Sequence, residues 1–201
     1  QTDKLNKIRE PKGQQYIKKS GREYIDEFSE NYARKLEDPN FDRGVLTGYS
    51  YLDYVTRGLR EAELFIIAGQ TSSGKSVWLN NMAVQMWQQN NLIHKKASRN
   101  KQDYKIKGRN VLYFSLEMPL ASCFRRTMAK LADVSLYGLR DATLDAGELK
   151  SFWQAKDFFK DYPWDFEIVD LGRGASISKI EEIYNSREYE EDEKPIIFLD
   201  Y

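Results

Sequence analysis

The sequence predicts an α/β fold in which a mainly parallel sheet is flanked by helices. Three observations support this class. Short apolar runs alternate with helical patterns from Gly44 to Tyr201, a glycine-rich loop joins the first run to the first long helix, and the last run ends in an aspartate. Residues 1–43 differ in composition from the rest of the chain, because they are highly charged and carry a single helical pattern. We therefore divide the chain into a helical linker or docking segment at 1–43 and a domain at 44–201.

The composition describes a folded chain and excludes several classes of protein. Of 201 residues, 41% are hydrophobic, and 31 Lys and Arg balance 31 Asp and Glu, so no global positive field attracts nucleic acid. One cysteine, Cys123, and one histidine, His94, exclude an intrachain disulfide and a zinc site of His and Cys ligands. No apolar run approaches the ~20 residues that span a bilayer. We expect a cytoplasmic chain with no membrane contact, in which Cys123 is a small buried hydrophobe.

The helical pattern of the first segment runs from Arg22 to Asp38. Its apolar residues, Ile25, Phe28, Tyr32 and Leu36, follow at steps of three, four and four, which places them on one face of a charged helix. Such a stripe predicts a docking helix. The partner is either the chain's own domain or a neighbouring subunit.

The elements of the domain follow in order along the chain. Strands are expected at 64–68, 110–114, 166–169 and 196–199, and helices at 75–89, 119–132 and 146–159, with a further helix opened by Ser178 with Glu181 at capping-box spacing. A basic run occupies 94–109 and an acidic run 188–193. Both fit solvated loops, and the basic run, which includes Tyr104, could instead contact a nucleic acid backbone and a base.

The glycine-rich loop carries the chemistry. It reads Gly69, Gln70, Thr71, Ser72, Ser73, Gly74, Lys75, Ser76, which fits G-x-x-x-x-G-K-[ST] between a strand and a helix. The glycines allow main-chain N–H groups to turn toward phosphate oxygens at the positive end of a helix. Lys75 would place a charge on the β- and γ-phosphates, and the Ser76 hydroxyl would be a ligand of Mg²⁺.

Hydrolysis of a triphosphate needs two further carboxylates. One holds the water ligands of the metal, and the other polarises the attacking water. Asp200 ends the apolar run 196–199, so its carboxylate is expected at the carboxyl edge of the sheet, which is a Walker B pattern. Glu117 follows the strand at 110–114 and reaches the same edge. From position alone, Glu117 is equally a helix N-terminal acid that interacts with the helix dipole.

A family resemblance rests on several short motifs together. These are Thr47-Gly48, Leu52-Asp53, Gly58-Leu59, Glu63-Leu64 before the glycine-rich loop, Phe114-Ser115-Leu116-Glu117-Met118, and Asp200-Tyr201. Over residues 44–201 the chain resembles the RecA-like ATPase domain of DnaB-type replicative helicases of bacteria or phages. Two positions depart from the family, since Arg57 and Ala62 stand where it usually has glycine, and the segment 94–109 is longer than usual.

The resemblance carries expectations about activity and partners. It implies ATP and Mg²⁺ as cofactors, Glu117 as the residue that activates water, and Asp200 as the residue that serves Mg²⁺. It implies a homo-hexameric ring that moves single-stranded DNA, with primase and a helicase loader as further partners. The helix at 22–38 would resemble the linker helix that such proteins dock on the adjacent subunit.

The resemblance also bears on the length of the chain. In this class of ATPases, the strand between the P-loop strand and the Walker B strand comes after Walker B in the sequence. We therefore expect the 201 residues to be part of a longer chain, cut at Walker B. The DNA-contacting loops and the arginine finger of the class would lie in the remainder.

Other functions remain open on the sequence alone. A RecA-like recombinase or a clock-type ATPase shares the core, although the Phe-Ser-Leu-Glu-Met element at 114–118 disfavours both. A non-hydrolysing ATP-binding assembly module is a different class, and the residues at hand do not separate it from an ATPase. A small-molecule P-loop kinase is disfavoured because no arginine-rich lid segment is present.

Overall fold

The computed structural model describes residues 20–38, 41–88, 109–189 and 194–201. The chain divides into two compact units, residues 1–43 and 44–201, which are considered separately. Of the sequence expectations, the basic run at 94–109 with His94 lies outside the described residues except for Arg109, as do residues 190–193 of the acidic run.

The first unit contains the helix α1, Gly21–Glu37. Ser20 and Glu23 form a capping box: the Glu23 main-chain N–H donates to Ser20 Oγ (3.3 Å), and the Ser20 N–H donates to Glu23 Oε2 (2.7 Å). No residue of this described helix is buried. Its apolar stripe, Ile25, Phe28, Tyr32 and Leu36, is 53–70% exposed. The expected helix is confirmed, with its apolar stripe along one face.

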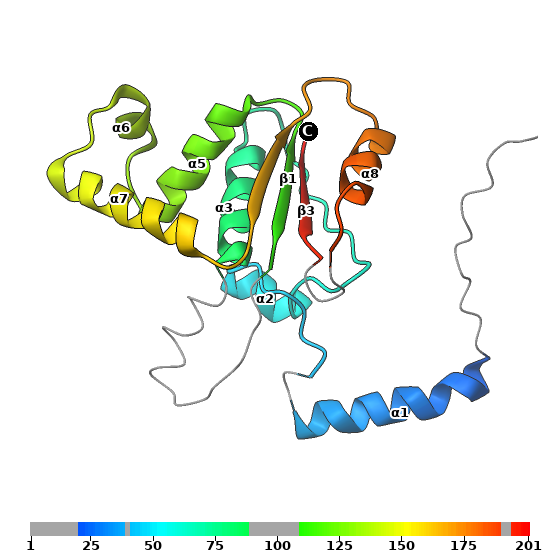
Figure 1. The fold of residues 1–201 in the computed structure, drawn as a ribbon. Helices are drawn as coiled ribbons and strands as arrows, with labels where there is room; N and C mark the ends of the chain where they lie inside the picture. The colour runs from blue at the N-terminus through cyan, green and yellow to red at the C-terminus, as the bar shows by residue number, and fades with distance from the viewer. Residues whose placement is uncertain (1–19, 39–40, 89–108, 190–193) are drawn as a thin grey trace, which may run out of the picture. The chain divides into compact units, whose positions relative to one another are not determined.

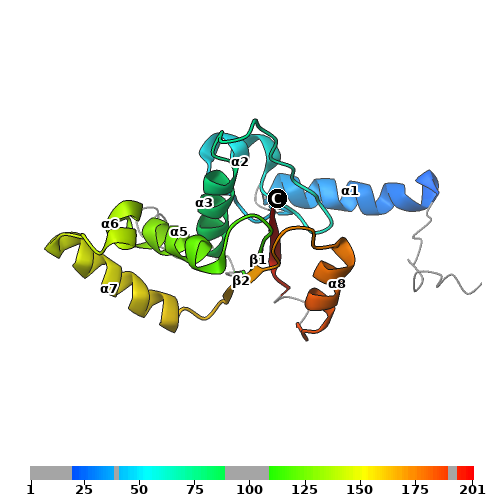
Figure 2. The ribbon, with the colours of Figure 1, turned by 90° about the horizontal axis from the view of Figure 1, so that it is seen from above.

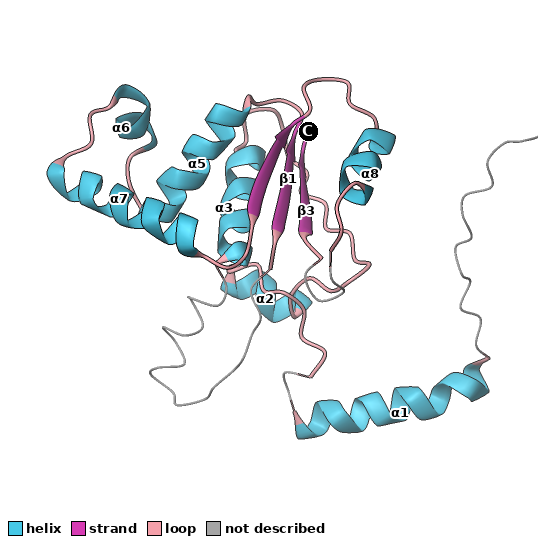
Figure 3. Cartoon of the chain, in the orientation of Figure 1, coloured by secondary structure: helices cyan, strands magenta, loops and turns pink. Residues whose placement is uncertain are grey.

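The second unit is built on three parallel strands, β1 (Val111–Ser115), β2 (Phe166–Asp170) and β3 (Ile196–Asp200), in the order β2-β1-β3 (Figure 1). Val111 pairs with Phe166 on one side and with Ile196 on the other, and the register continues to Ser115. The carboxyl ends of all three strands therefore meet at one edge of the sheet (Figure 3).

Helices cover both faces of this sheet. The helices α3 (Lys75–Trp87) and α5 (Leu120–Ala132) lie on one face, and α8 (Ile177–Asn185) lies on the other, as Figure 2 shows from above. Successive residues of β1 alternate between the two cores: Val111 and Tyr113 pack with α3 and Cys123, whereas Leu112 and Phe114 pack near α8. The predicted α/β class and the burial of Cys123 are confirmed.

The remaining helices attach to the α5 side or precede the glycine-rich loop. They are α2 (Ser50–Thr56), α6 (Leu136–Asp141) and α7 (Ala146–Asp161). The C-terminal end of α3 is held by Trp87, which is fully buried, contacts four aromatic rings and donates its indole N–H to the Trp164 carbonyl (2.7 Å). The sequence patterns did not predict α2 and α6, because each is too short for a helical period to show.

The segment before α2 explains the Thr47-Gly48 and Asp53 motif. The buried Asp53 carboxylate accepts hydrogen bonds from the Thr47 N–H (2.6 Å), the Thr47 hydroxyl (2.7 Å) and the Gly48 N–H (3.0 Å). Arg57 and Ala62 both have positive φ, 62° and 63°. Glycine is the residue that adopts this backbone without strain, so these two departures from the family lie where glycine is physically favoured.

Two expectations about local structure are wrong. The helix α8 is capped by Ser176 rather than Ser178: Ser176 has an extended backbone and its side chain accepts from the Lys179 N–H, whereas Ser178 lies inside the helix. The Ser176 side chain satisfies the Lys179 N–H, one of the donors at the helix start that have no acceptor within the helix, so α8 begins at Ile177. Residues 64–68 do not form the expected strand.

The missing strand at 64–68 has a physical explanation. Residues 64–68 pair with none of the strands β1, β2 and β3 that the structure describes. A strand requires a hydrogen-bonded neighbour. Without one, Leu64 and Ile66 remain 85% and 76% exposed, and on β3 the side chains of Ile197 and Leu199 are also exposed.

Candidate nucleotide-binding site

The glycine-rich loop leads directly into α3 at the carboxyl edge of the sheet. Gly74 is the N-cap of α3 and has φ 90°, a conformation that side chains disfavour. A Cβ on Gly69 would lie 2.6 Å from Ser73 Oγ, so a larger residue there would force the Ser73 side chain to move. The backbone conformation therefore requires glycine at Gly74, and close packing with Ser73 favours it at Gly69.

The N-terminal turn of α3 points its main-chain donors toward this loop. The Trp78 N–H donates to the Gly74 carbonyl (2.9 Å), which is the first bond of the helix. The N–H groups of the residues before Trp78, at 75–77, therefore have no acceptor within the helix. Such a helix end is partially positive and suits a phosphate.

An open pocket of about 710 Å³ lies in front of this helix end. It is lined by Thr71, Ser72, Gly74, Lys75, Ser76 and Val77 of the loop and α3, by Leu116, Glu117 and Met118 after β1, by Arg126 of α5, by Arg173 and Gly174 after β2, and by Tyr201 after β3. The pocket brings together the loop and the segments that follow all three strands. Of the predicted site residues, Gly69, Gln70, Ser73 and Asp200 are not part of this lining, and Asp200 is bonded to Ser76, which is.

The Lys75 ammonium reaches back across the loop. Its Nζ donates to the carbonyl oxygens of Gly69 (2.9 Å) and Gln70 (3.0 Å). This arrangement holds a positive charge over the concave side of the loop, beside the N–H groups of the helix end. An anion that enters the pocket would meet this charge first.

The hydroxyl of Ser76 and the carboxylate of Asp200 are in direct contact. Ser76 Oγ donates to Asp200 Oδ1 (2.8 Å), and the Tyr113 hydroxyl donates to Asp200 Oδ2 (3.1 Å). Asp200 is 3% exposed, so both carboxylate oxygens are satisfied by neutral donors within the protein. Burial and the nearby Asp200 charge raise the pKa of the Tyr113 phenol, which keeps it protonated and donating.

Glu117 stands at the other side of the pocket on a rigid turn. The Ser115 hydroxyl donates to the Met118 carbonyl (2.7 Å) and accepts from the Met118 N–H (3.1 Å), which closes the chain around Glu117. The Leu116 N–H donates to the Asp200 carbonyl (3.0 Å), which ties this turn to β3. The Glu117 side chain is exposed and lines the pocket with Lys75.

Two arginines of this pocket were not predicted from the sequence. Arg126 lies on α5, and Arg173 lies between Gly172 and Gly174 after β2. The glycines on both sides of Arg173 have positive φ, 65° and 88°. The position of Arg173 just after a strand was a usable signal, because every loop that follows a strand of a parallel sheet reaches the same edge.

The residues present fit a magnesium ion that is bound together with phosphates. Among the described residues, no group of three or more His, Cys, Asp and Glu side chains could hold a metal by itself. Mg²⁺ bound with a nucleotide takes only one or two protein oxygens, and phosphates and water complete its shell. The paired Ser76 hydroxyl and Asp200 carboxylate supply that number and kind of oxygen.

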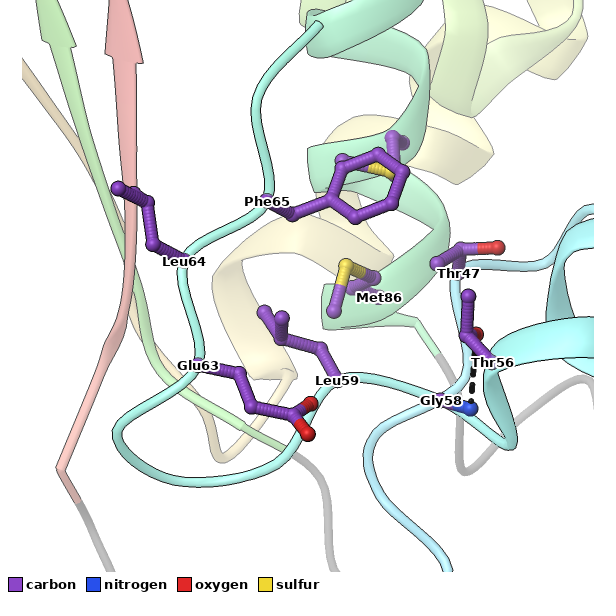
Figure 4. A pocket seen from close by; sticks show the side chains of 9 residues that line it. Thr47, Thr56, Gly58, Leu59, Glu63, Leu64, Phe65 and Met86 are labelled. Atoms are coloured by element: carbon purple, nitrogen blue, oxygen red, sulfur yellow. Dashed lines mark hydrogen bonds between the residues drawn. The ribbon is translucent and has the colours of Figure 1, made fainter.

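A second hollow, of about 400 Å³, lies away from the glycine-rich loop. Its lining is Thr47, Thr56, Gly58, Leu59, Glu63, Leu64, Phe65, Met82 and Met86, and Figure 4 shows Leu59, Phe65 and Met86 around it. Glu63, the charged residue of this lining, already accepts from the Arg60 N–H (2.9 Å). This hollow is apolar and offers no arrangement for phosphate chemistry.

Comparisons with known proteins identify a family. Residues 44–201 match the model of the DnaB-like helicase C-terminal domain. A replicative DNA helicase DnaB from Pasteurella multocida is 30% identical over 130 residues, which are 64% of this chain and 24% of that protein. The DnaB of Haemophilus influenzae is 33% identical over 106 residues, 53% of this chain and 19% of that protein.

A solved structure shares the fold. This structure, a solved ATPase domain, superimposes with a TM-score of 0.65 at 17% sequence identity, over 91% of this chain and 58% of that one. The chain spans about a quarter of the length of the Pasteurella relative. In the part of the chain that the structure describes, no helix is long and apolar enough to cross a membrane. The family match covers every strand and the whole pocket, and the chain therefore belongs to the family of DnaB-like helicase C-terminal domains, with a RecA-like ATPase fold.

Proposed function

We propose that this chain is the nucleotide-binding part of a replicative DNA helicase subunit that hydrolyses Mg²⁺-ATP. The observation that carries the proposal is the contact of Ser76 with Asp200 (2.8 Å) beside a P-loop, with Glu117 across the same pocket. Ser76 and Asp200 would be the metal-binding groups and Glu117 the water-activating group that triphosphate hydrolysis needs. Ser76 lies at the start of α3, Asp200 ends β3, and Glu117 follows the neighbouring strand β1.

Binding begins with the triphosphate. Its β- and γ-phosphates would lie over the N-terminal turn of α3, where the N–H groups at 75–77 face them. The Lys75 ammonium would exchange the carbonyl oxygens of Gly69 and Gln70 for phosphate oxygens, which are charged and therefore stronger acceptors. The loop residues Gly69 to Ser76 form this phosphate cradle.

Ser76 and Asp200 would hold Mg²⁺, Ser76 through its hydroxyl oxygen and Asp200 as the acceptor that orients this hydroxyl and the water ligands. The metal supplies charge neutralisation on the β- and γ-phosphate oxygens. Asp200 is suited to the task because it is held on both oxygens and nearly excluded from solvent.

Glu117 would accept a proton from the attacking water. The oxygen of that water forms a bond to the γ-phosphorus as the bond to the β–γ bridging oxygen breaks, which yields ADP and inorganic phosphate. The exposure of Glu117 toward the pocket leaves its carboxylate available for this step. Its turn, closed by Ser115 and Met118, fixes its position.

The proposal extends to assembly and partners. The chain would form a homo-hexameric ring in which a neighbour completes the ATP site, and the cycle would move single-stranded DNA, with primase and a loader as partners. Residues 1–43 would be the linker, and the apolar stripe of α1 would dock on the adjacent subunit. The helicase names of the relatives favour this function over a recombinase or clock-type ATPase.

The test separates the hydrolysing helicase from a non-hydrolysing assembly module. In the intact protein, Lys75→Ala and Glu117→Gln should each abolish ATP-driven strand separation, and phosphate release with single-stranded DNA should fall with it. Glu181→Gln, an exposed carboxylate on α8, is the matched control and should behave as wild type. Undiminished unwinding by the Glu117 variant would remove that residue from the mechanism, and phosphate release absent from the wild type would favour the module.

A further inference from the structure

The Tyr113 side chain is a polar group at the centre of an otherwise apolar core. Tyr113 on β1 pairs with Phe198 on β3, and the two rings stack with centroids 6.2 Å apart. Asp200 follows Phe198 by two residues, so it lies on the same face of the sheet as Tyr113 and diagonally opposite to it. A diagonal neighbour is within reach of a long aromatic side chain.

The hydroxyl of Tyr113 is not needed for packing. The residue is fully buried, and its neighbours in this core are apolar side chains such as Met86 and Trp87. A phenylalanine would fill the same space without placing a polar atom there. Within the described part of the chain, the hydroxyl donates to Asp200 Oδ2 (3.1 Å), so the polar atom is directed at the proposed metal site.

The two hydroxyl donors hold Asp200 from different directions. Ser76 comes from α3 and bonds Oδ1, while Tyr113 comes from within the sheet and bonds Oδ2. With one oxygen bonded, the carboxylate could still rotate about its Cβ–Cγ bond. With both bonded, its plane is defined, and Oδ1 stays on the side of the P-loop.

We propose that Tyr113 is a positioning residue that orients Asp200 for the bound metal ion. This inference rests on the proposed function, because it assumes that Asp200 serves a metal. Partners that hold the ligands of a metal, without touching the metal, typically contribute about 10–100-fold to its affinity. Tyr113 would act in this way through one hydrogen bond, and the phenylalanine variant would lose that contribution while keeping the ring stack with Phe198.

The experiment measures metal affinity directly. In the intact protein with saturating ADP, free Mn²⁺ is titrated and the unbound ion is followed by electron paramagnetic resonance. Tyr113→Phe should weaken Mn²⁺ binding at least about tenfold. Binding of ADP in the presence of EDTA should stay within about twofold of the wild type, because Tyr113 does not line the phosphate pocket. An unchanged Mn²⁺ affinity would overturn the proposal.

The chain offers a matched control. The Tyr162 hydroxyl is a partly buried phenol that donates over the same distance, 3.1 Å, to the Trp87 carbonyl at the opposite end of α3. Tyr162→Phe removes an equivalent bond far from Asp200 and should leave Mn²⁺ affinity unchanged. Equal weakening by both variants would indicate a general loss of structure and would also overturn the positioning role.

Two further variants complete the test. Replacing Tyr113 by 4-aminophenylalanine restores a donor at the same place, and it should recover most of the Mn²⁺ affinity; failure to recover it would contradict the hydrogen-bond explanation. Asp200→Asn should weaken Mn²⁺ binding by itself and make the further change Tyr113→Phe ineffective. If Asp200→Asn has no effect, the metal role of Asp200 in the proposed function fails, whereas an effect of Asp200→Asn without one of Tyr113→Phe refutes only the role of Tyr113.

Discussion

The Ser76 hydroxyl lies 2.8 Å from Asp200 Oδ1, although 124 positions separate the two residues in the chain. Ser76 is in the first turn of α3, and Asp200 is the last residue of β3. The contact therefore joins the beginning of the P-loop helix to the end of the last strand. Any change that moves either element should alter the proposed metal site.

Removing the hydroxyl of Ser76 should impair metal use. We expect Ser76→Ala to raise the Mg²⁺ concentration for half-maximal phosphate release about tenfold or more, because the proposed metal ligand and a donor to the buried Asp200 are both lost. Ser76→Thr retains a hydroxyl and should remain near the wild type. A Mg²⁺ titration of both variants in the intact protein checks this, and identical curves for Ser76→Ala and wild type would contradict the assignment.

A side chain at Gly74 should weaken nucleotide binding. Gly74 caps α3 with φ 90°. For a residue with a Cβ, a left-handed backbone costs roughly 1–2 kcal/mol of conformational free energy. We expect Gly74→Ala to lower the affinity for ADP by about tenfold, measured by calorimetric titration. Gly21→Ala in α1, where a Cβ meets no atom within 4 Å, is the control. Equal affinities for Gly74→Ala and wild type would show that the loop tolerates other conformations.

Glycine at position 62 should stabilise the protein. Ala62 has φ 63°, and relief of that strain exceeds the entropy that glycine adds to the unfolded chain. We expect Ala62→Gly to raise the free energy of unfolding by about 0.5–1 kcal/mol. Ala129→Gly, inside α5, should instead lower it by about 1 kcal/mol. Urea denaturation measures the free energy of unfolding of the two variants. A change in the same direction for both would contradict the role of the positive φ at Ala62.

Trp87 should be the largest single contributor to the core beneath α3. It is fully buried among four aromatic rings, and its indole N–H donates to the Trp164 carbonyl. We expect Trp87→Ala to cost about 3–5 kcal/mol in the free energy of unfolding. Trp153→Ala, at a half-exposed position on α7, should cost much less. Thermal unfolding of both variants measures the loss of stability in each. Similar losses for the two variants would contradict this account of the core.

Alkaline pH should destabilise the protein through its buried phenol. Burial and the Asp200 charge raise the pKa of Tyr113 above that of an unfolded tyrosine, which is near 10. The stability that this phenol provides is therefore complete below pH ~10 and is lost as the pH rises further, by about 1.4 kcal/mol per pH unit. Urea denaturation between pH ~8 and ~11 should show the decline. In Tyr113→Phe the decline should be smaller, and an equal decline in both proteins would exclude Tyr113 as its source.

Much of the site was predictable because its signals are local. The spacing of Gly69, Gly74, Lys75 and Ser76 at the start of a helix is a local signal of a phosphate loop, and it can be recognised although residues 64–68 do not form the expected strand. The expected ends of α3, α5 and α7 lie within about two residues of the observed ends. Each of these helices is long enough for its apolar repeat to be recognised in the sequence. The pairing of Asp200 with the P-loop followed from a general rule about the edges of parallel sheets.

Other features could not be read from local patterns. The apolar composition of 64–68 is that of a strand, yet the segment lacks a hydrogen-bonded neighbour among the described strands, and its Leu64 and Ile66 stay exposed. Ser178 with Glu181 has the capping-box spacing, yet α8 is capped by Ser176, whose side chain accepts from the Lys179 N–H. Arg126 and Arg173 join the pocket only because distant elements fold over it.

By itself, the sequence determined the α/β class, the phosphate loop and the candidate carboxylates Glu117 and Asp200. The reason is that helical periods, turn-forming glycines and apolar runs express short-range sterics and hydrogen bonding. Only the tertiary structure decided that the Tyr113 hydroxyl meets Asp200, because that contact requires β1 and β3 to be adjacent and in the register that places Tyr113 opposite Phe198. Strand pairing is a long-range property, and the orientation of the proposed metal ligand depends on it.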